Sequence, residues 1–236
     1  MPELSVVLPC YNESGNLKNI LDRYRPLASK VPLDLILVDN GSTDNTKAIL
    51  QEALGRPENA FALRVTVEKN IGYGYGIQAG LKECRTNVVA FSHADLQCPP
   101  EDLLTAYGIY KKESAAGPCL VKGRRKGRRP TADRIVTWFY NHLTRILLRM
   151  NVTLDVNAEP KLFPISLVKR LLEGPLDFTF DLFVLHAAQA AGYRLLEFEV
   201  SYEPRAWGRS KLAANPWMRL LTSLKAFRRL IQLSLH

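Results

Sequence analysis

The chain has 236 residues, of which 47% are hydrophobic, and this composition predicts one domain with a substantial core. No apolar run approaches about 18 residues, so we expect no transmembrane helix, and the acidic start at 1–4 is unlike a secretory leader. Four scattered cysteines without metal-site spacing predict reduced thiols in the cytosol. The formal charge of +9 indicates a polyanionic partner, with a solvated basic surface as the alternative.

Strands and helices alternate along the first half of the chain. Strands are expected at 4–9, 33–39, 61–68 and 87–92. Helices are expected at about 13–29 and at 76–83, and a further helix should follow Asp44, which would be its N-cap. This alternation predicts right-handed crossovers and an α/β fold with a mainly parallel sheet in three layers. Polar residues that follow the strands, at 11–13, 39, 69–70 and 95, should therefore meet at one edge of the sheet.

The second half of the chain is less regular. We expect a strand at 120–123, a basic loop through 129, helices at 134–150 and 180–191, and a strand at 194–202. A basic amphipathic helix at 217–235 closes the chain. Such a helix can lie in an anionic membrane interface, pack on the domain core, or bind a membrane partner subunit. No nucleic-acid-binding motif accompanies the charge, so we expect no nucleic-acid partner.

The chain is organised around residues 88–101, where a buried strand ends in His93, Asp95 and Gln97 before two prolines. Asp and Gln supply the hard oxygen ligands that Mg²⁺ and Mn²⁺ accept, so the segment is a candidate cation site. A surface turn before a proline-capped helix would have a similar sequence. Asp39 is likewise either a turn carboxylate or an acceptor for a nucleoside base or ribose hydroxyl.

A glycine-rich segment at 72–76 contains a GxGxxA match, GYGIQA at 74–79. It follows the third predicted strand and not the first, which is atypical of a dinucleotide-binding turn. The alternative is a flexible loop whose backbone approaches a ligand, with Lys69 near a phosphate.

Four motifs in the first half carry a family resemblance. They are 9–13 (PCYNE), 38–46 (VDNGSTDNT), 69–74 (KNIGYG) and 94–101 (ADLQCPPE). In this order and spacing they resemble the family-2 glycosyltransferases of GT-A fold, a Rossmann-like α/β/α sandwich. The segments 122–124 (KGR), 160–163 (PKLF), 191–194 (AGYR) and 205–211 (RAWGRSK) are similar to the branch of dolichol-phosphate mannose synthase and bacterial polyprenyl-phosphate glycosyltransferases.

The resemblance implies a single domain over 1–236, with a nucleotide-sugar half at 1–117, an acceptor half at 118–214 and a C-terminal helix at 215–236. The residues implied at the nucleotide-sugar donor are Pro9, Tyr11, Glu13, Asp39, Lys69, Asn70, Gly74, His93, Ala94 and Asp95. Asp95 and Gln97 would hold Mg or Mn. Arg124, Arg125, Ser210 and Lys211 would bind an acceptor phosphate, and Asp95, Asp181 and Arg205 would be catalytic.

The implied reaction is inverting transfer of a sugar, from GDP-mannose or a UDP-hexose, to a polyprenyl or dolichyl phosphate. A phosphate acceptor is already anionic near pH 7 and needs no strong base. We then expect a peripheral enzyme at the cytoplasmic face of a membrane. One alternative is transfer to a saccharide or protein hydroxyl with Asp181 as base. Another is a catalytically weak nucleotide-sugar-binding protein, because His93 stands where the family usually has Asp and imidazole favours transition metals over Mg.

Overall fold

A computed structural model describes residues 1–126, 131–150, 155–201, 203 and 216–234; at 131–137, 139 and 216–220 it describes the backbone alone. Seven strands form one sheet in the order β3-β2-β1-β4-β6-β5-β7. Their bounds are β1 Leu4–Cys10, β2 Leu33–Asn40, β3 Ala62–Val67, β4 Val88–Phe91, β5 Cys119–Lys126, β6 Lys161–Pro164 and β7 Arg194–Ser201. The sheet is mainly parallel, as predicted, and has the Rossmann-like architecture of a GT-A fold.

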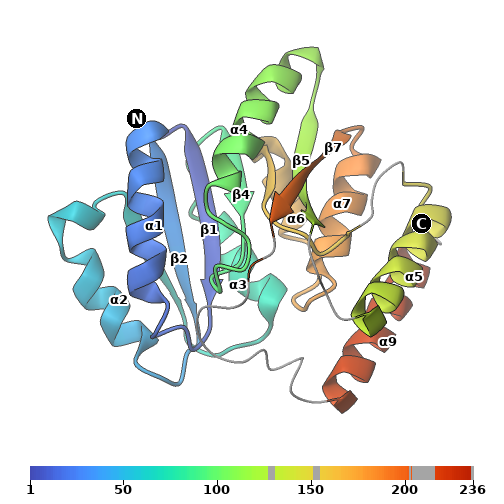
Figure 1. The fold of residues 1–236 in the computed structure, drawn as a ribbon, viewed down its shortest axis with the longest axis horizontal. Coiled ribbons are helices and arrows are strands. Elements are labelled where there is room, and N and C mark those ends of the chain that lie inside the picture. Colours follow the sequence, from blue (N-terminus) through green and yellow to red (C-terminus); the bar gives the residue numbers. More distant parts are fainter. Residues whose placement is uncertain (127–130, 151–154, 202, 204–215, 235–236) are drawn as a thin grey trace.

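Helices cover both faces of the sheet, which confirms the three layers (Figure 1). Their bounds are α1 Leu17–Lys30, α2 Thr46–Leu54, α3 Tyr73–Leu81, α4 Asp102–Glu113, α5 Thr131–Leu147, α6 Val168–Leu171, α7 Phe180–Ala190 and α9 Pro216–Ser234. Side chains of β1 alternate between the two layers: Val6 belongs to the core cluster with residues of α1 and α4, whereas Val7 belongs to the cluster with residues of α3 and α7. Within the described residues, no helix is long and apolar enough to cross a membrane.

One strand reverses direction, and this reversal shapes the polar edge of the sheet. β1 pairs in parallel with β2 and β4, so the carboxyl ends of these strands share an edge. β6 runs antiparallel to β4 and places its first residue, Lys161, opposite the last residue of β4, Phe91. The start of β6 therefore lies at the same edge as the ends of β1, β2 and β4.

Two sequence expectations are wrong at this level. The segment 72–76 is not a loop, because α3 begins at Tyr73 and its glycines let the helix approach neighbouring chain closely. The basic residues from Arg124 to Lys126, which follow the strand predicted at 120–123, are not a loop either, because β5 continues through them in pairing with β7. The cap of α2 differs slightly: Asn45 occupies the N-cap position, while Asp44 accepts the hydrogen bond from the Thr46 amide.

Candidate active site

The loops after β1 and β2 are tied together at the carboxyl edge. Asp39 is buried, and its Oδ1 accepts a hydrogen bond from the Ser42 amide at 3.0 Å. The Ser42 hydroxyl in turn accepts from the Asn12 amide at 3.1 Å, and Thr46 Oγ1 accepts from the Glu13 amide at 2.9 Å. These contacts bring Glu13 and Asp39, two residues predicted at the donor, into one wall of the site.

The loop after β3 joins this wall through a close backbone approach. Gly41 has φ +70°, and a Cβ there would lie 2.3 Å from the Asn70 nitrogen, with Lys69 almost as close. Only glycine fits such a position without strain. Pro9 ends the apolar part of β1, and Tyr11 follows half-buried in the next loop. The predicted convergence of the first three strand ends is therefore present.

The turn after β4 holds Asp95 by its own backbone. Asp95 is buried, its Oδ1 accepts from the Gln97 amide at 3.1 Å, and Leu96 between them has φ +57°. The Gln97 carbonyl accepts from the Glu203 amide at 2.8 Å, and Gln97 Nε2 donates to the Glu203 carbonyl at 3.2 Å. With its nitrogen used in this way, the Gln97 side chain would offer its oxygen to a cation.

His93 is a partly buried neighbour of this turn, and the adjacent Ala94 is buried. The Nδ1 atom of His93 lies 3.4 Å from the Tyr73 hydroxyl. Burial lowers the pKa of His93, and the opposing carboxylates of Asp95 and Asp181 do not outweigh it. A neutral imidazole is therefore expected near pH 7, and it contributes no positive charge beside the candidate cation site.

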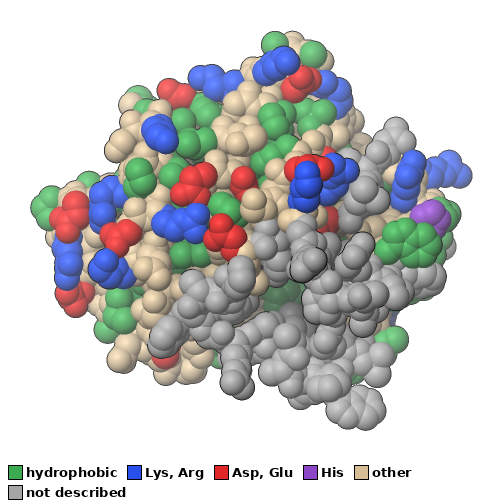
Figure 2. All heavy atoms as spheres, viewed as in Figure 1, with side chains coloured by type: hydrophobic (Ala, Val, Ile, Leu, Met, Phe, Trp, Pro, Cys, Tyr) green, Lys and Arg blue, Asp and Glu red, His purple; other side chains and the backbone are tan. Residues whose placement is uncertain are grey.

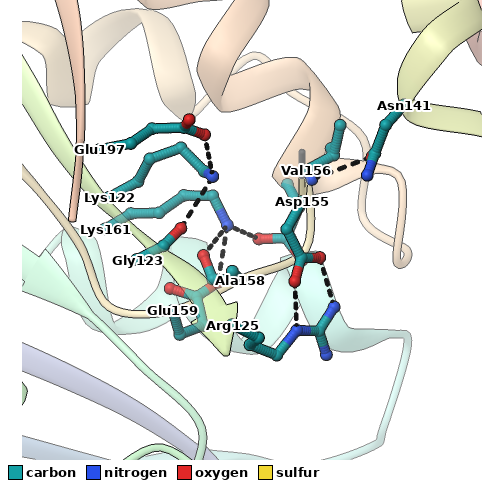
Figure 3. A network of polar contacts seen from close by, with 11 residues as sticks. Lys122, Gly123, Arg125, Asn141, Asp155, Val156, Ala158, Glu159, Lys161 and Glu197 are labelled. Carbon is teal, nitrogen blue, oxygen red and sulfur yellow. Dashed lines mark hydrogen bonds and ion pairs between the residues drawn. The ribbon is translucent and has the colours of Figure 1, made fainter. Parts of the chain in front are cut away.

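A buried polar network lies around Lys161 at the start of β6 (Figure 3). The fully buried Lys161 donates from Nζ to Asp181 Oδ1 at 2.7 Å, to Glu159 Oε1 at 2.8 Å and to the Ala158 carbonyl at 3.3 Å. Among the described residues, Glu159 Oε2 has no hydrogen-bond partner. Burial raises the pKa of Glu159 well above its usual range, and Asp181 adds to this although Lys161 opposes it.

The basic residues of β5 are matched by acidic partners. Lys122 pairs with Glu197 at 2.8 Å, Arg124 with Glu199 at 2.9 Å, Lys126 with Glu199 at 2.8 Å, and Arg125 with Asp155 through two contacts, one of 2.7 Å. Lys122 is also fully buried. Arg124 and Arg125 have separate acidic partners, and their role toward an acceptor phosphate stays a prediction.

Some predicted site residues are not brought to the polar edge by described contacts. Gly74 lies in α3, where a Cβ would be 2.4 Å from the Pro175 carbonyl, so this glycine lets the helix pack against the chain at 175–177. Arg205, Ser210 and Lys211 lie outside the described residues.

Sequence reasoning missed several members of the site. Tyr73, Asp155, Glu159 and Lys161 were given no role, although 160–163 was noted as a family-like segment. A usable signal was present, because a lysine directly precedes the short apolar run of β6 and a glutamate lies two residues before it. Charged residues of this kind seldom become buried unless they are paired.

The donor atoms at the turn fit a hard divalent cation. Within the described part of the chain, no three His, Cys, Asp or Glu side chains are grouped so that they could hold a metal on their own. Mg²⁺ commonly binds through one or two carboxylates and completes its shell with substrate phosphate oxygens and water. Asp95 and Gln97 match that incomplete set, so the arrangement suits a cation shared with a diphosphate.

Comparison with known proteins agrees with this geometry. Residues 5–172 match the glycosyl transferase family 2 profile. An uncharacterised glycosyltransferase of Mycobacterium tuberculosis (strain H37Rv) is 29% identical over 223 residues, which cover 90% of both chains. The dodecaprenyl-phosphate galacturonate synthase of Rhizobium johnstonii is 27% identical over 228 residues, which cover 94% of this chain and 65% of that protein.

A solved structure supports the fold. The glucosyl-3-phosphoglycerate synthase of Mycobacterium tuberculosis, in complex with Mn²⁺, UDP and phosphoglyceric acid, superposes with a TM-score of 0.72 at 19% identity. The match covers 99% of this chain and 78% of that one. Another crystal structure of that enzyme holds Mg²⁺ and UDP.

Proposed function

The chain belongs to glycosyl transferase family 2, and from that premise we propose that it moves a sugar from a nucleotide-sugar to a polyprenyl phosphate in an inverting, metal-dependent reaction. The observation that carries this proposal is the polar edge itself. There the Asp95 turn follows the central strand β4, beside the joined loops that contain Glu13 and Asp39. Nucleotide ligands of open α/β sheets bind at such an edge.

On the donor side, Asp39 would accept from the nucleoside, and Lys69 would lie near the diphosphate. Asp95 and Gln97 would hold Mg²⁺ or Mn²⁺ on the diphosphate oxygens, as the carboxylate and amide oxygens of this turn allow. When bound, the cation would stabilise the negative charge that develops on the leaving diphosphate. The Mn²⁺ and UDP in the mycobacterial synthase support this assignment at the level of the fold.

On the acceptor side, a phosphate monoester is favoured over a sugar or protein hydroxyl. A hydroxyl acceptor would need a base, and the expected base was Asp181. That carboxylate is buried and accepts a hydrogen bond from the Lys161 ammonium, so it is poorly placed to take a proton. A phosphate oxygen needs no base. The similarity to a dodecaprenyl-phosphate synthase supports a lipid phosphate in particular.

An exposed apolar surface supports an acceptor that resides in a membrane. We call it the α5–α9 surface; its exposed apolar residues are Trp138, Ile146, Leu147, Leu221, Leu224 and Ile231, and its basic residues are Arg145, Arg149, Lys225 and Arg228. The two helices pack together at one side of the molecule (Figure 1). Leu230 is buried in the core and anchors α9, while the exposed leucines of α9 face away. We propose that this surface lies on an anionic membrane.

A donor screen tests the function. Radiolabelled GDP-mannose, UDP-glucose, UDP-GlcNAc and UDP-galacturonate would each be incubated with undecaprenyl phosphate and Mn²⁺ or Mg²⁺, and label in the lipid phase would be counted. We expect one donor to give metal-dependent labelling at least tenfold above a reaction with EDTA. Labelling of a hydroxyl acceptor without labelling of lipid phosphate would contradict the proposed acceptor. Metal-dependent donor binding without transfer to either would favour a binding protein.

A further inference from the structure

Two fully buried lysines lie side by side in the sheet. Lys122 of β5 is paired in register with Lys161 of β6. Lys122 bonds to the Gly123 carbonyl and to Glu197, both at 2.8 Å. Lys161 instead bonds to Glu159 and Asp181 (Figure 3 shows the Glu159 contact). The two lysines are therefore matched in burial and neighbourhood, but they differ in their acidic partners.

The Lys161 cluster carries a defined charge arrangement. An isolated ammonium in a protein interior is strongly disfavoured, so a buried lysine is retained as a cation only if it is paired. Burial works against the charge of Lys161, but the carboxylates of Asp181 and Glu159 outweigh it and raise its pKa. Burial and the nearby Asp181 raise the pKa of Glu159, so Glu159 is the weaker anionic partner. Asp181 makes the shorter of the two ion pairs of Lys161, at 2.7 Å.

The cluster adjoins the end of the strand that leads to the Asp95 turn. Lys161 is opposite Phe91, the last residue of β4, and its ammonium lies 5.3 Å from the centre of that ring. His93 and Asp95 follow two and four residues later, and the charges of Lys161 and Asp181 both act on His93. Lys161 contacts Asp181 directly, and the charge of Asp181 also acts on Tyr73, His93, Tyr140 and Glu159.

We propose that Lys161 is a positioning residue of the transfer site: its ammonium fixes the Asp181 carboxylate beside the turn that contains His93 and Asp95, and Asp181 serves there as a stationary negative group and not as a proton acceptor. This inference rests on the proposed function for the reaction that it concerns. It explains why a lysine opens β6 at the polar edge, where an apolar residue would pack at lower cost.

The first test compares the two lysines. Lys161→Met and Lys122→Met each remove one buried ammonium from neighbouring positions. We expect Lys161→Met to lower kcat at least tenfold while donor KM changes less than threefold, because displacement of a positioned group reduces the rate more than substrate affinity. Lys122→Met should keep kcat within about twofold at a comparable loss of Tm. Equal values of kcat per folded molecule in the two variants would overturn the proposal.

A second variant covers the case in which Lys161→Met does not fold. Asp181→Asn has nearly the same shape and loses the negative charge. We expect the ratio of wild-type to Asp181→Asn kcat to be tenfold or more and constant from pH 6.5 to 9. A ratio that falls about tenfold per pH unit would identify Asp181 as a proton acceptor, since hydroxide would replace it. A ratio near one would show that Asp181 has no role. Either result would overturn the proposal.

Failure of the proposed function is recognised separately. If the wild-type protein transfers no sugar to undecaprenyl phosphate, that function fails, and the same variants are compared by metal-dependent hydrolysis of UDP-glucose or GDP-mannose, which needs no acceptor. The expected order is unchanged, with Lys161→Met and Asp181→Asn reduced and Lys122→Met close to wild type. Any other order in hydrolysis would overturn the positioning role.

Discussion

Asp95 combines a structural contact with a proposed metal-binding role. Its side chain closes the turn after β4 by accepting from the Gln97 amide, and we propose that the same side chain holds the cation. The two tasks separate in Asp95→Asn, because the amide oxygen can still accept from the backbone while the negative charge is lost. Structure and catalysis can therefore be tested independently at this position.

We expect Asp95→Asn to lower metal-dependent transfer by roughly 100-fold or more, because a Lewis acid supplies several kcal/mol and each 1.36 kcal/mol is a factor of ten. Its Tm should stay within a few degrees of wild type. The measurement is kcat across a range of Mn²⁺ concentrations. Glu101→Gln is the control, since Glu101 is exposed and paired with Arg23. A transfer rate for Asp95→Asn equal to that of Glu101→Gln would refute the metal assignment.

Asp102 lies in the first turn of α4, and its surroundings in the folded protein disfavour the ionised form of its carboxyl group. Burial, together with Glu101 and Glu203, raises its pKa to about 6, although Arg23 opposes the shift, and Oδ2 has no hydrogen-bond partner among the described residues. The folded state therefore binds this proton more tightly than the unfolded state does. Stability from this group is present below pH 4 and is lost as the pH rises to about 6.

Asp102→Asn should accordingly raise the free energy of unfolding at pH 7.5 by about 1 kcal/mol, after a discount for the half-exposed side chain, and by almost nothing at pH 4. The corresponding rise in Tm is about 2–4 °C. Urea unfolding at both pH values measures the difference. An equal gain at the two pH values would show that helix propensity, and not the charge of Asp102, is responsible.

At the scale of elements, the sequence predicted those strands and turns whose position depends mainly on neighbouring residues. The strands β1 to β4 and the position of Asp95 after β4 were predictable because apolar runs and turn residues mark them directly. The antiparallel strand β6 was not predicted, because strand order depends on pairing between distant segments. The positions of Glu159 and Lys161 at the site were missed for this reason. The extension of β5 was missed for the same reason, since acidic partners on β7 make a basic run compatible with a strand.

The glycine-rich start of α3 was also misread as a loop, and Gly80, inside the predicted helix, has a packing role that the sequence does not display. A Cβ at Gly80 would lie 2.4 Å from Val7 and 2.9 Å from Val38, so α3 rests directly on β1 and β2. Gly108 in α4 gives the opposite case, because nothing lies within 4 Å of a Cβ there. Gly80 and Gly108 can therefore be compared directly, because both lie in helices but only Gly80 is in close contact with the sheet.

Gly80→Ala should destabilise the protein by about 1–3 kcal/mol, because an extra methyl in a packed layer forces neighbouring side chains apart. Gly108→Ala should stabilise it by about 0.5–1 kcal/mol, because alanine favours the helix and meets no neighbour. Chemical denaturation of both variants tests the pair. If Gly80→Ala were as stable as wild type, the close approach of α3 to the sheet would be wrong.

At the scale of the whole molecule, the excess positive charge is unevenly distributed. Over α1 and α2, acidic and basic side chains are interspersed (Figure 2), as in the pairs of Lys18 with Asp22 and Arg56 with Glu52. On the α5–α9 surface, basic residues instead accompany exposed apolar ones. A surface with both properties favours an anionic bilayer, because burial of apolar area and attraction to lipid headgroups act together.

Binding to vesicles should therefore depend on both properties. The triple variant Leu221→Ser, Leu224→Ser and Ile231→Ser should bind vesicles of phosphatidylglycerol and phosphatidylcholine at least tenfold more weakly than wild type, since three exposed apolar side chains that would enter the bilayer interface are lost. Wild-type binding should also fall as NaCl rises from 50 to 500 mM, because salt screens the headgroup attraction. Leu63→Ser with Ile71→Ser is the control, since both residues are exposed and lie outside α5 and α9. Cosedimentation measures all three proteins, and equal binding by the triple and control variants would place the membrane contact elsewhere.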